Sequence, residues 1–177
     1  MTEQQQIEGC KAGDSKAQRS LYDTYSRKMM GVCMRYCGND RDTAMDLLQE
    51  GFVRIFTGIK SYDGRGSLEG WIRKVVVNVA LDYIRTNDLL RNTEDIELVV
   101  EQDIDSSAID DISANELMEL IAELPDGFRT VFNMFVIEGY SHKEIADKLG
   151  ITESTSRSQL TRAKQLLQKK LREFYEE

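Results

Sequence analysis

The sequence is poor in residues that break or cross-link a chain. Its 177 residues include one proline, Pro125, and three cysteines. The scarcity of proline leaves long stretches without a helix breaker and favours helices over loop-rich β structure. Cys10, Cys33 and Cys37 are odd in number and contain no CxxC pair, so they give no pattern for a zinc site. We interpret them as small packing residues, with a redox role as the alternative.

Segments that would direct the chain to a membrane, or make it an enzyme, are also missing. No apolar run approaches the roughly 20 residues that span a bilayer. The first six residues lack the basic flank and apolar stretch of a signal peptide, so we expect a cytoplasmic protein with no membrane insertion. There is no GxxxxGK[ST] phosphate loop. The one histidine, His142, has no cluster of partners around it. We therefore expect no catalytic residue, no metal site and no cofactor.

The net charge of −8 would argue against a nucleic-acid partner if it were spread evenly. It is not spread evenly, because residues 87–113 hold nine acids and one base and account for all of it. Residues 140–172 hold eight Lys or Arg against three acids, and residues 54–91 hold seven against four. Local fields decide what a charged partner meets, so two basic segments remain available to a nucleic acid.

Apolar spacing and breaker residues predict an all-α protein. In the first half we expect helices over residues 2–12, from Asp14 or Ser15 to about Cys37, from Asp40 to about Thr57, and over 67–86. A glycine-punctuated loop, residues 58–66, precedes the last of these helices. In the second half we expect helices over 113–124, from near Pro125 through Ile137, over 141–149, and from Thr152 or Ser154 nearly to the C-terminus.

The acidic stretch between these halves keeps no helical period in its scattered apolar residues. We interpret residues 88–112 as a flexible linker, with an acidic helix packed on a domain as the alternative. The sequence thus predicts two small helical domains, residues 1–87 and 113–177, joined by this linker.

Residues 141–164 carry the strongest local pattern, that of a helix-turn-helix. Ile145, Ala146 and Leu149 are spaced to face inward from the first helix, and Ala146 is small where two helices must cross closely. Gly150 supplies the turn between the helices. In the second helix, an apolar stripe is expected along Leu160, Ala163, Leu167, Leu171 and Phe174.

The opposite side of that second helix combines short hydroxyl side chains with arginines, which we call the recognition face. Such a surface suits a DNA major groove, where the helix backbone comes close to the DNA and an Arg side chain can donate two hydrogen bonds to one guanine. Ordinary solvated faces usually include Glu, whereas this arc between residues 154 and 172 has none. The face comprises Ser154, Arg157, Ser158, Thr161, Arg162, Gln165 and Lys169.

A narrow polar stripe runs along the otherwise apolar helix 67–86. Its members are Trp71, Lys74, Asn78, Asp82 and Arg85, at spacings of three and four. Cations, an amide and an indole together can hold a phosphate backbone and stack on an unpaired base, and Arg65 and Arg73 lie beside them. The alternatives are that Asp82 pairs with Arg85 along the helix and that Trp71 belongs to the core.

The helix over residues 40–57 presents an acidic, mildly apolar side, which we call the docking face. Such a face is poor for DNA and suits a basic groove on a protein. As a single feature it is weak, because most surface helices are acidic somewhere. It comprises Asp42, Asp46, Gln49, Glu50, Val53 and Thr57.

Four segments, in this order and spacing, resemble the sigma-70 family, specifically the small extracytoplasmic-function (ECF) sigma factors. They are DLLQEGFVRIF from Asp46, WIRKVVVNVALDYIR from Trp71, LPDGFRTVF from Leu124, and EGYSHKEIA from Glu138 with the helix-turn-helix that follows. The resemblance covers about residues 10–90 and 114–172. It implies a protein that binds core RNA polymerase and promoter DNA, is regulated by an anti-sigma factor, and directs promoter recognition, DNA opening and initiation.

The resemblance also implies roles for individual residues. The first segment is similar to the helix that grips the β′ clamp helices of the polymerase, here through Asp46, Gln49, Glu50 and Val53. Loop 58–66 and the stripe helix resemble the part that opens and reads the −10 element, here through Arg65, Trp71, Arg73, Lys74, Asn78 and Arg85.

The C-terminal domain resembles the region that binds the −35 element and the β flap. The predicted −35 contacts are Ser154, Thr155, Arg157, Ser158, Thr161 and Arg162. Similar proteins often have Gly and Val at the positions of Ser154 and Ser156, and a basic residue at that of Gln159. The −35 preference of relatives therefore does not transfer to this chain.

Two other functions fit parts of the sequence. A conventional helix-turn-helix regulator with an N-terminal dimerisation or sensor domain would bind duplex DNA without polymerase. The net basic segment 54–91 argues against it, because a sensor domain needs no cations there. A helical adaptor that binds only proteins is disfavoured by the acid-free recognition face.

Overall fold

The computed structural model describes residues 1–90 and 112–176, and every regular element within them is helical. The prediction of an all-α fold is thus confirmed. The chain divides into two compact units, Met1–Tyr83 and Ile84–Glu177, which we call the N-terminal and C-terminal units. Most of the predicted linker, residues 88–112, lies outside the described residues.

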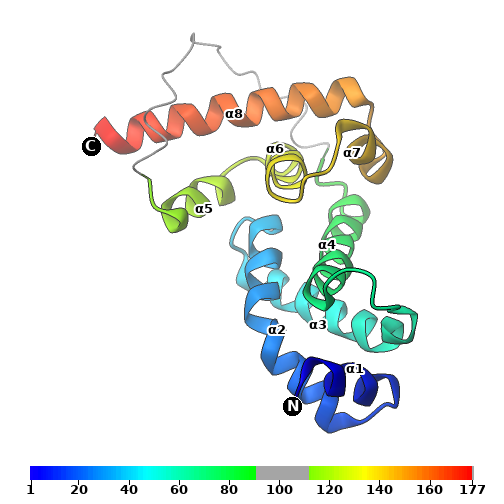
Figure 1. Cartoon of the computed structure of the whole chain (residues 1–177). Helices are drawn as coiled ribbons and strands as arrows, with labels where there is room; N and C mark the ends of the chain where they lie inside the picture. Colours follow the sequence, from blue (N-terminus) through cyan, green and yellow to red (C-terminus); the bar gives the residue numbers. More distant parts are fainter. Residues whose placement is uncertain (91–111, 177) are drawn as a thin grey trace. The chain divides into compact units, whose positions relative to one another are not determined.

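The helices of the N-terminal unit begin at the polar caps that the sequence offers. They are α1 (Glu3–Lys11), α2 (Ser15–Tyr36), α3 (Arg41–Gly58) and α4 (Leu68–Thr86), with a short 3-10 helix η1 (Ile59–Ser61) after α3 (Figure 1). The last three residues of α4 belong to the C-terminal unit. Side-chain oxygens of Thr2, Asp14 and Asp40 accept backbone N–H groups at the starts of α1, α2 and α3. Each cap satisfies a donor that has no partner inside its helix.

The core of the N-terminal unit is built from one apolar side of each helix. On α2 it includes Leu21, Tyr25, Met29 and Val32, spaced four, four and three apart. Helix α3 contributes Leu47, Leu48, Phe52 and Ile55. Gly51 lets α3 and α4 approach closely, because a Cβ there would lie only 3.1 Å from Cγ2 of Val76. This packing leaves the polar sides of α3 and α4 facing outward.

The C-terminal unit contains α5 (Ala114–Ala122), α6 (Asp126–Phe132), a π-helical turn η4 (Asn133–Ile137), α7 (His142–Leu149) and α8 (Glu153–Glu176) (Figure 1). Reciprocal capping boxes start α5, through Ser113 and Glu116, and α7, through Ser141 and Glu144. Gly150 ends α7 with a φ of 67°, a left-handed conformation that suits glycine. The predicted helix-turn-helix is therefore formed by α7 and α8.

Two details of the C-terminal unit differ from the expectation. The helix predicted to run through Ile137 changes to π geometry at Asn133, which spacing arguments based on a 3.6-residue period do not detect. The apolar stripe of α8 is buried at Leu160, Ala163, Leu167 and Leu171, but Phe174 is 46% exposed. The predicted apolar stripe is therefore buried as far as Leu171 and exposed at Phe174.

The cysteines behave as packing residues. Cys10 and Cys33 are buried, Cys37 is half-buried, and all three are free thiols. Burial raises the pKa of Cys33 to about 12, which keeps this thiol protonated and unreactive. Among the described residues, no group of His, Cys, Asp or Glu could hold a metal ion. None of the helices there has the length and apolar character needed to cross a bilayer.

Candidate protein-docking and nucleic-acid surfaces

Helix α3 brings the predicted docking residues together on its outer side. Asp46, Gln49 and Glu50 are exposed, and Val53 beside them is 59% exposed. An exposed valine among acids gives a partner both apolar area and negative charge. The buried residues on the other side of α3 fix the orientation of this face.

An ion-pair chain connects the docking face to the polar stripe. Arg54 donates to Oε1 of Glu50 at 2.8 Å and to Oδ2 of Asp82 at 2.7 Å. These hydrogen bonds, first that to Asp82 and then that to Glu50, raise the pKa of Arg54 above its usual value. Asp82 is the one acid of the predicted stripe, and Arg54 offsets its charge. Spacing along α4 could not reveal this partner, because Arg54 is on another helix.

The polar stripe lies on α4 with its members exposed to different degrees. Lys74 and Arg85 are exposed, whereas Trp71 and Asn78 are half-buried. The indole ring of Trp71 contacts Tyr62, with ring centroids 5.6 Å apart. Trp71 is therefore neither a core residue nor a free surface residue, and part of its ring remains accessible for stacking. Arg73, on the same helix, is half-buried.

The loop before α4 is tied down by several hydrogen bonds. Nζ of Lys11 donates to the carbonyl oxygen of Tyr62 at 2.8 Å, and the Tyr62 hydroxyl donates to that of Gly66 at 2.9 Å. Arg65, near the end of the loop, is highly exposed and pairs with Asp63 at 3.1 Å. The anchoring by Lys11 was not predicted, because it joins α1 to a loop 51 residues away.

Most of the predicted contacts on α8 form one exposed surface. Ser154, Arg157, Ser158 and Thr161 are exposed and Arg162 is half-buried. The hydroxyls of Ser158 and Thr161 donate to carbonyl oxygens one turn earlier, so their oxygen lone pairs remain available as acceptors. Arg157 pairs with Glu153 at 3.0 Å. This acid lies just before the arc that is free of Glu, and the ion pair stays within α8.

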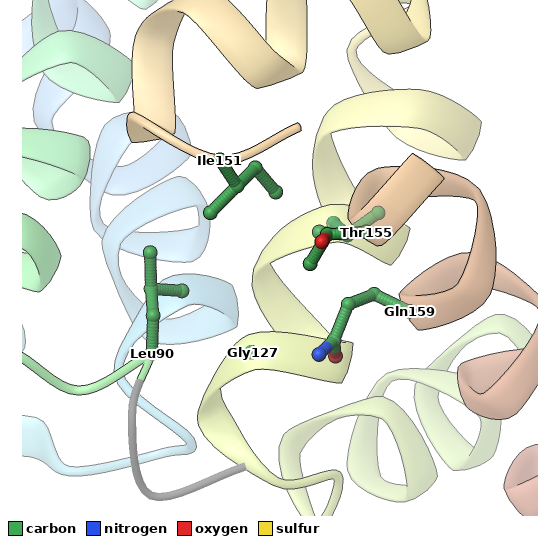
Figure 2. A pocket seen from close by; sticks show the side chains of 6 residues that line it. Leu90, Gly127, Ile151, Thr155 and Gln159 are labelled. Atoms are coloured by element: carbon green, nitrogen blue, oxygen red, sulfur yellow. The ribbon is translucent and has the colours of Figure 1, made fainter. Parts of the chain in front are cut away.

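Thr155 is half-buried, as is Arg162, which lies seven residues later on the same side of α8. Its backbone N–H donates to Oγ1 of Thr152, and it lines a small pocket of about 10 Å³ together with Gly127 of α6 (Figure 2). Gln159, one turn further, lines the same pocket and is buried. Thr155 thus contributes to the start of α8 and lies near α6, beside the exposed surface formed by Ser154, Arg157, Ser158 and Thr161.

His142 has a structural partner that sequence reasoning missed. Its Nδ1 lies 2.9 Å from Oγ of the fully buried Ser156, and its ring stacks on Phe135 with centroids 4.5 Å apart. Burial, followed by the positive charge of Arg157, lowers the pKa of His142 below its usual value. The pair joins the two helices of the helix-turn-helix. The combination of His142 with Ser156, where similar proteins often have Val, was the signal available in the sequence.

Comparisons with known proteins match both halves of the chain. The family model "Sigma-70 region 2" matches residues 21–89, and "Sigma-70, region 4" matches residues 114–167. The chain is 27% identical over 183 residues to the ECF RNA polymerase sigma-E factor of Haemophilus influenzae, covering 97% of this chain and 96% of that protein. It is 28% identical over 180 residues to the ECF RNA polymerase sigma factor SigW of Bacillus subtilis, covering 95% and 96%.

A solved structure agrees in fold. The sigma factor RpoE of Bartonella quintana, crystallised in complex with the anti-sigma factor NepR, matches with a TM-score of 0.52 at 18% identity. The match covers 87% of this chain and 96% of that chain.

Proposed function

This chain belongs to the sigma-70 family of RNA polymerase sigma factors, and from that membership we propose how its residues divide the work of initiation. It is an ECF sigma factor, which binds core RNA polymerase and directs it to promoters. Sigma factors are not enzymes, so the chemistry of RNA synthesis belongs to the polymerase. The observation that carries this function is the ordered match to regions 2 and 4, together with near full-length similarity to ECF sigma factors.

Residues 1–87 form the polymerase-binding and −10 domain in this proposal, and residues 113–177 form the −35 domain. The docking face contacts the β′ clamp helices through Asp46, Gln49, Glu50 and Val53. Their exposure and negative charge support this role, because a basic groove would gain charge complementarity and cover the exposed valine. The acidic segment 88–112 joins the two domains.

The polar stripe and the loop before it hold the opened −10 element. Lys74 and Arg85 neutralise phosphates, Trp71 stacks on an unpaired base, and Asn78 donates to a base edge. Arg65 and Arg73 add positive charge beside them. Breaking base-pair stacks costs about 1.4 kcal/mol per step, and captured bases together with polymerase contacts offset that cost without ATP.

The exposed surface of α8 reads the −35 element in the major groove. Arg157 and Arg162 supply forked donors for guanine, while Ser154, Ser158 and Thr161 keep the helix close to the DNA. Thr155, which also supports the start of the helix, contacts the same element. The same domain contacts the β flap of the polymerase.

Two further partners follow from the family. An anti-sigma factor is proposed as regulator, since the structural relative from Bartonella quintana was solved in complex with one. The cytoplasm is proposed as the location, because core polymerase and the promoter are there.

Transcription in vitro with purified core polymerase tests the function. Adding the protein should give a stable complex with core and initiation that depends on the promoter. Failure of both across a panel of candidate promoters would refute the proposal. Tight binding of duplex DNA without polymerase would instead support a conventional helix-turn-helix regulator.

A further inference from the structure

The two helices of the helix-turn-helix are tied together at two points. The first is the turn itself, where Gly150 ends α7 with a left-handed backbone and the N–H of Ile151 donates to the carbonyl oxygen of Ala146 at 3.2 Å. The second lies at the opposite end of α7, where His142 pairs with Ser156 of α8. The two points are about 12 Å apart along the axis of α7, from a rise of 1.5 Å per residue. Together they fix the angle between α7 and α8.

The second point is a hydrogen bond to a buried hydroxyl. Ser156 is fully buried, and His142 is the one side chain in the described part of the chain that hydrogen-bonds to it. The imidazole is also held by Phe135 of η4, on which it stacks with the ring planes 19° apart. A neutral imidazole has one donor and one acceptor nitrogen, so it satisfies a hydroxyl in either tautomer. Because a buried hydroxyl without a partner is costly, this bond is a strong constraint.

The other contacts of α7 constrain rotation less. Its buried residues, Ile145, Ala146 and Leu149, are all apolar, and hydrophobic burial is non-directional. Near α6, the start of α8 borders the small pocket of about 10 Å³ lined by Thr155 and Gln159, so packing on that side leaves some space (Figure 2). A hydrogen bond, in contrast, weakens steeply when its donor and acceptor are not aligned. The polar pair therefore selects one rotation of α8 among those that apolar packing permits.

The rotation of α8 decides where its proposed −35 contacts lie. Ser156 is followed directly by Arg157 and Ser158, which are both exposed, so a rotation of the helix at Ser156 moves them across the groove. A forked contact between Arg and guanine discriminates between bases only when both of its hydrogen bonds are aligned. We propose that the hydrogen bond between His142 and Ser156 sets the −35 base preference of this sigma factor, although neither residue touches DNA. Both are positioning residues, and this inference rests on the proposed function.

The test measures base preference rather than affinity alone. Holoenzyme assembled from core polymerase and the full chain is equilibrated with duplex promoters randomised over the −35 element, and the bound DNA is sequenced. Ser156→Val introduces the residue that similar proteins often have there, and His142→Leu removes the partner, so each variant lacks the hydrogen bond. Both should change the preference at the same −35 position by at least about fivefold, the low end of what a forked Arg contact discriminates.

Three further variants separate the hydrogen bond from the stability of the fold. His142→Gln keeps an amide that can pair with the Ser156 hydroxyl, so it should retain the wild-type ranking of −35 sequences. Ile145→Val removes a methyl group from a fully buried position of α7 and should lower the melting temperature without changing that ranking. The double variant His142→Leu/Ser156→Val leaves no hydroxyl of this pair buried and unpaired, so it should fold and still show the changed ranking.

Two results would overturn the inference. One is a loss of binding in Ser156→Val and His142→Leu that is equal for all −35 sequences, as for Ile145→Val, since the pair would then support only the fold or a phosphate contact. The other is a changed ranking in Ser156→Val but not in His142→Leu, which would assign the effect to the bulk of valine. A wild-type holoenzyme that does not form, or that binds all −35 sequences equally, would instead refute the proposed function.

Discussion

The two surfaces that we propose for DNA binding are constructed differently. The proposed surface for the −35 element comes from α8 alone, and its ion pair and hydroxyl hydrogen bonds stay within that helix. The surfaces of the N-terminal unit depend on contacts between elements, such as Arg54 with Asp82 and Lys11 with the Tyr62 carbonyl. A substitution on α8 should therefore change one function, whereas one in the N-terminal unit can change two. Four substitutions test this difference, from the largest expected effect to the smallest.

Arg162→Ala should have the largest effect and affect only −35 recognition. A forked contact between Arg and guanine contributes about 1–3 kcal/mol of discrimination, so binding to a promoter with an intact −35 element should weaken about tenfold or more. Binding is measured by gel shift of holoenzyme on duplex promoter DNA. Affinity for core polymerase should not change, and a loss there would contradict the independence of the α8 surface. Lys164→Ala, at an exposed position of the same helix outside the recognition face, serves as a control for loss of charge.

Asn78→Ala should slow promoter opening about tenfold, which corresponds to the loss of one hydrogen bond of about 1.4 kcal/mol. Opening is followed by the fluorescence of a base analogue in the −10 element. The affinity for core polymerase, measured in parallel, should match that of the wild type. A parallel loss of core binding would show that the half-buried Asn78 supports the fold of α4 rather than contacting DNA.

Arg54→Met should have a smaller effect that appears in two measurements. It keeps most of the side-chain length but leaves Glu50 and Asp82 without this shared partner. Partly exposed ion pairs contribute less than about 1 kcal/mol each, so we expect up to about threefold weaker core binding and a similar slowing of opening. Glu50→Gln should affect core binding more, and Asp82→Asn should affect opening more. If Arg54→Met changed neither core binding nor the rate of opening, the ion pairs of Arg54 with Glu50 and Asp82 would contribute to neither function.

His142→Gln should have the smallest effect, seen in the pH dependence of stability. The pKa of His142 is lowered in the folded protein, so the unfolded chain takes up this proton first as the pH falls through about 6.5. The contribution of His142 to stability is complete above that pH and decreases as the pH falls toward the folded pKa. The melting temperature of His142→Gln should therefore vary less between pH 7.5 and 5.5 than that of the wild type. An unchanged profile would contradict this assignment.

The parts of the fold that the sequence predicts are those governed by neighbouring residues. Caps such as Ser113 and Ser141, and the left-handed Gly150, mark helix ends because their hydrogen bonds and backbone preferences act within a few positions. The inward residues Ile145, Ala146 and Leu149 were likewise predicted, and they are buried. The recognition face could be predicted from the sequence because all of its residues lie on a single helix.

The parts that were not predicted depend on tertiary contacts. Ser156 and Gln159, noted as departures from similar proteins, are both buried, so they bear on the packing of α8 more directly than on its outward surface. The partner of Ser156 is His142 on another helix, and the pairing of Arg54 with Asp82 spans 28 residues. Periodicity places a residue on a face of its own helix but does not say which residue of another helix meets it.

The position of Arg54 between two surfaces has a thermodynamic consequence. Suppose that binding of α3 to the polymerase changes how the charge of Asp82 is neutralised. The affinity of the polar stripe for the opened strand would then change by some factor. Thermodynamic linkage requires that the opened strand changes the affinity for the polymerase by the same factor. If that factor is an increase, the sigma factor binds the polymerase more tightly while it is bound to the opened strand and more weakly once the strand is released. One guanidinium between two carboxylates would then help to set how long the protein stays after initiation.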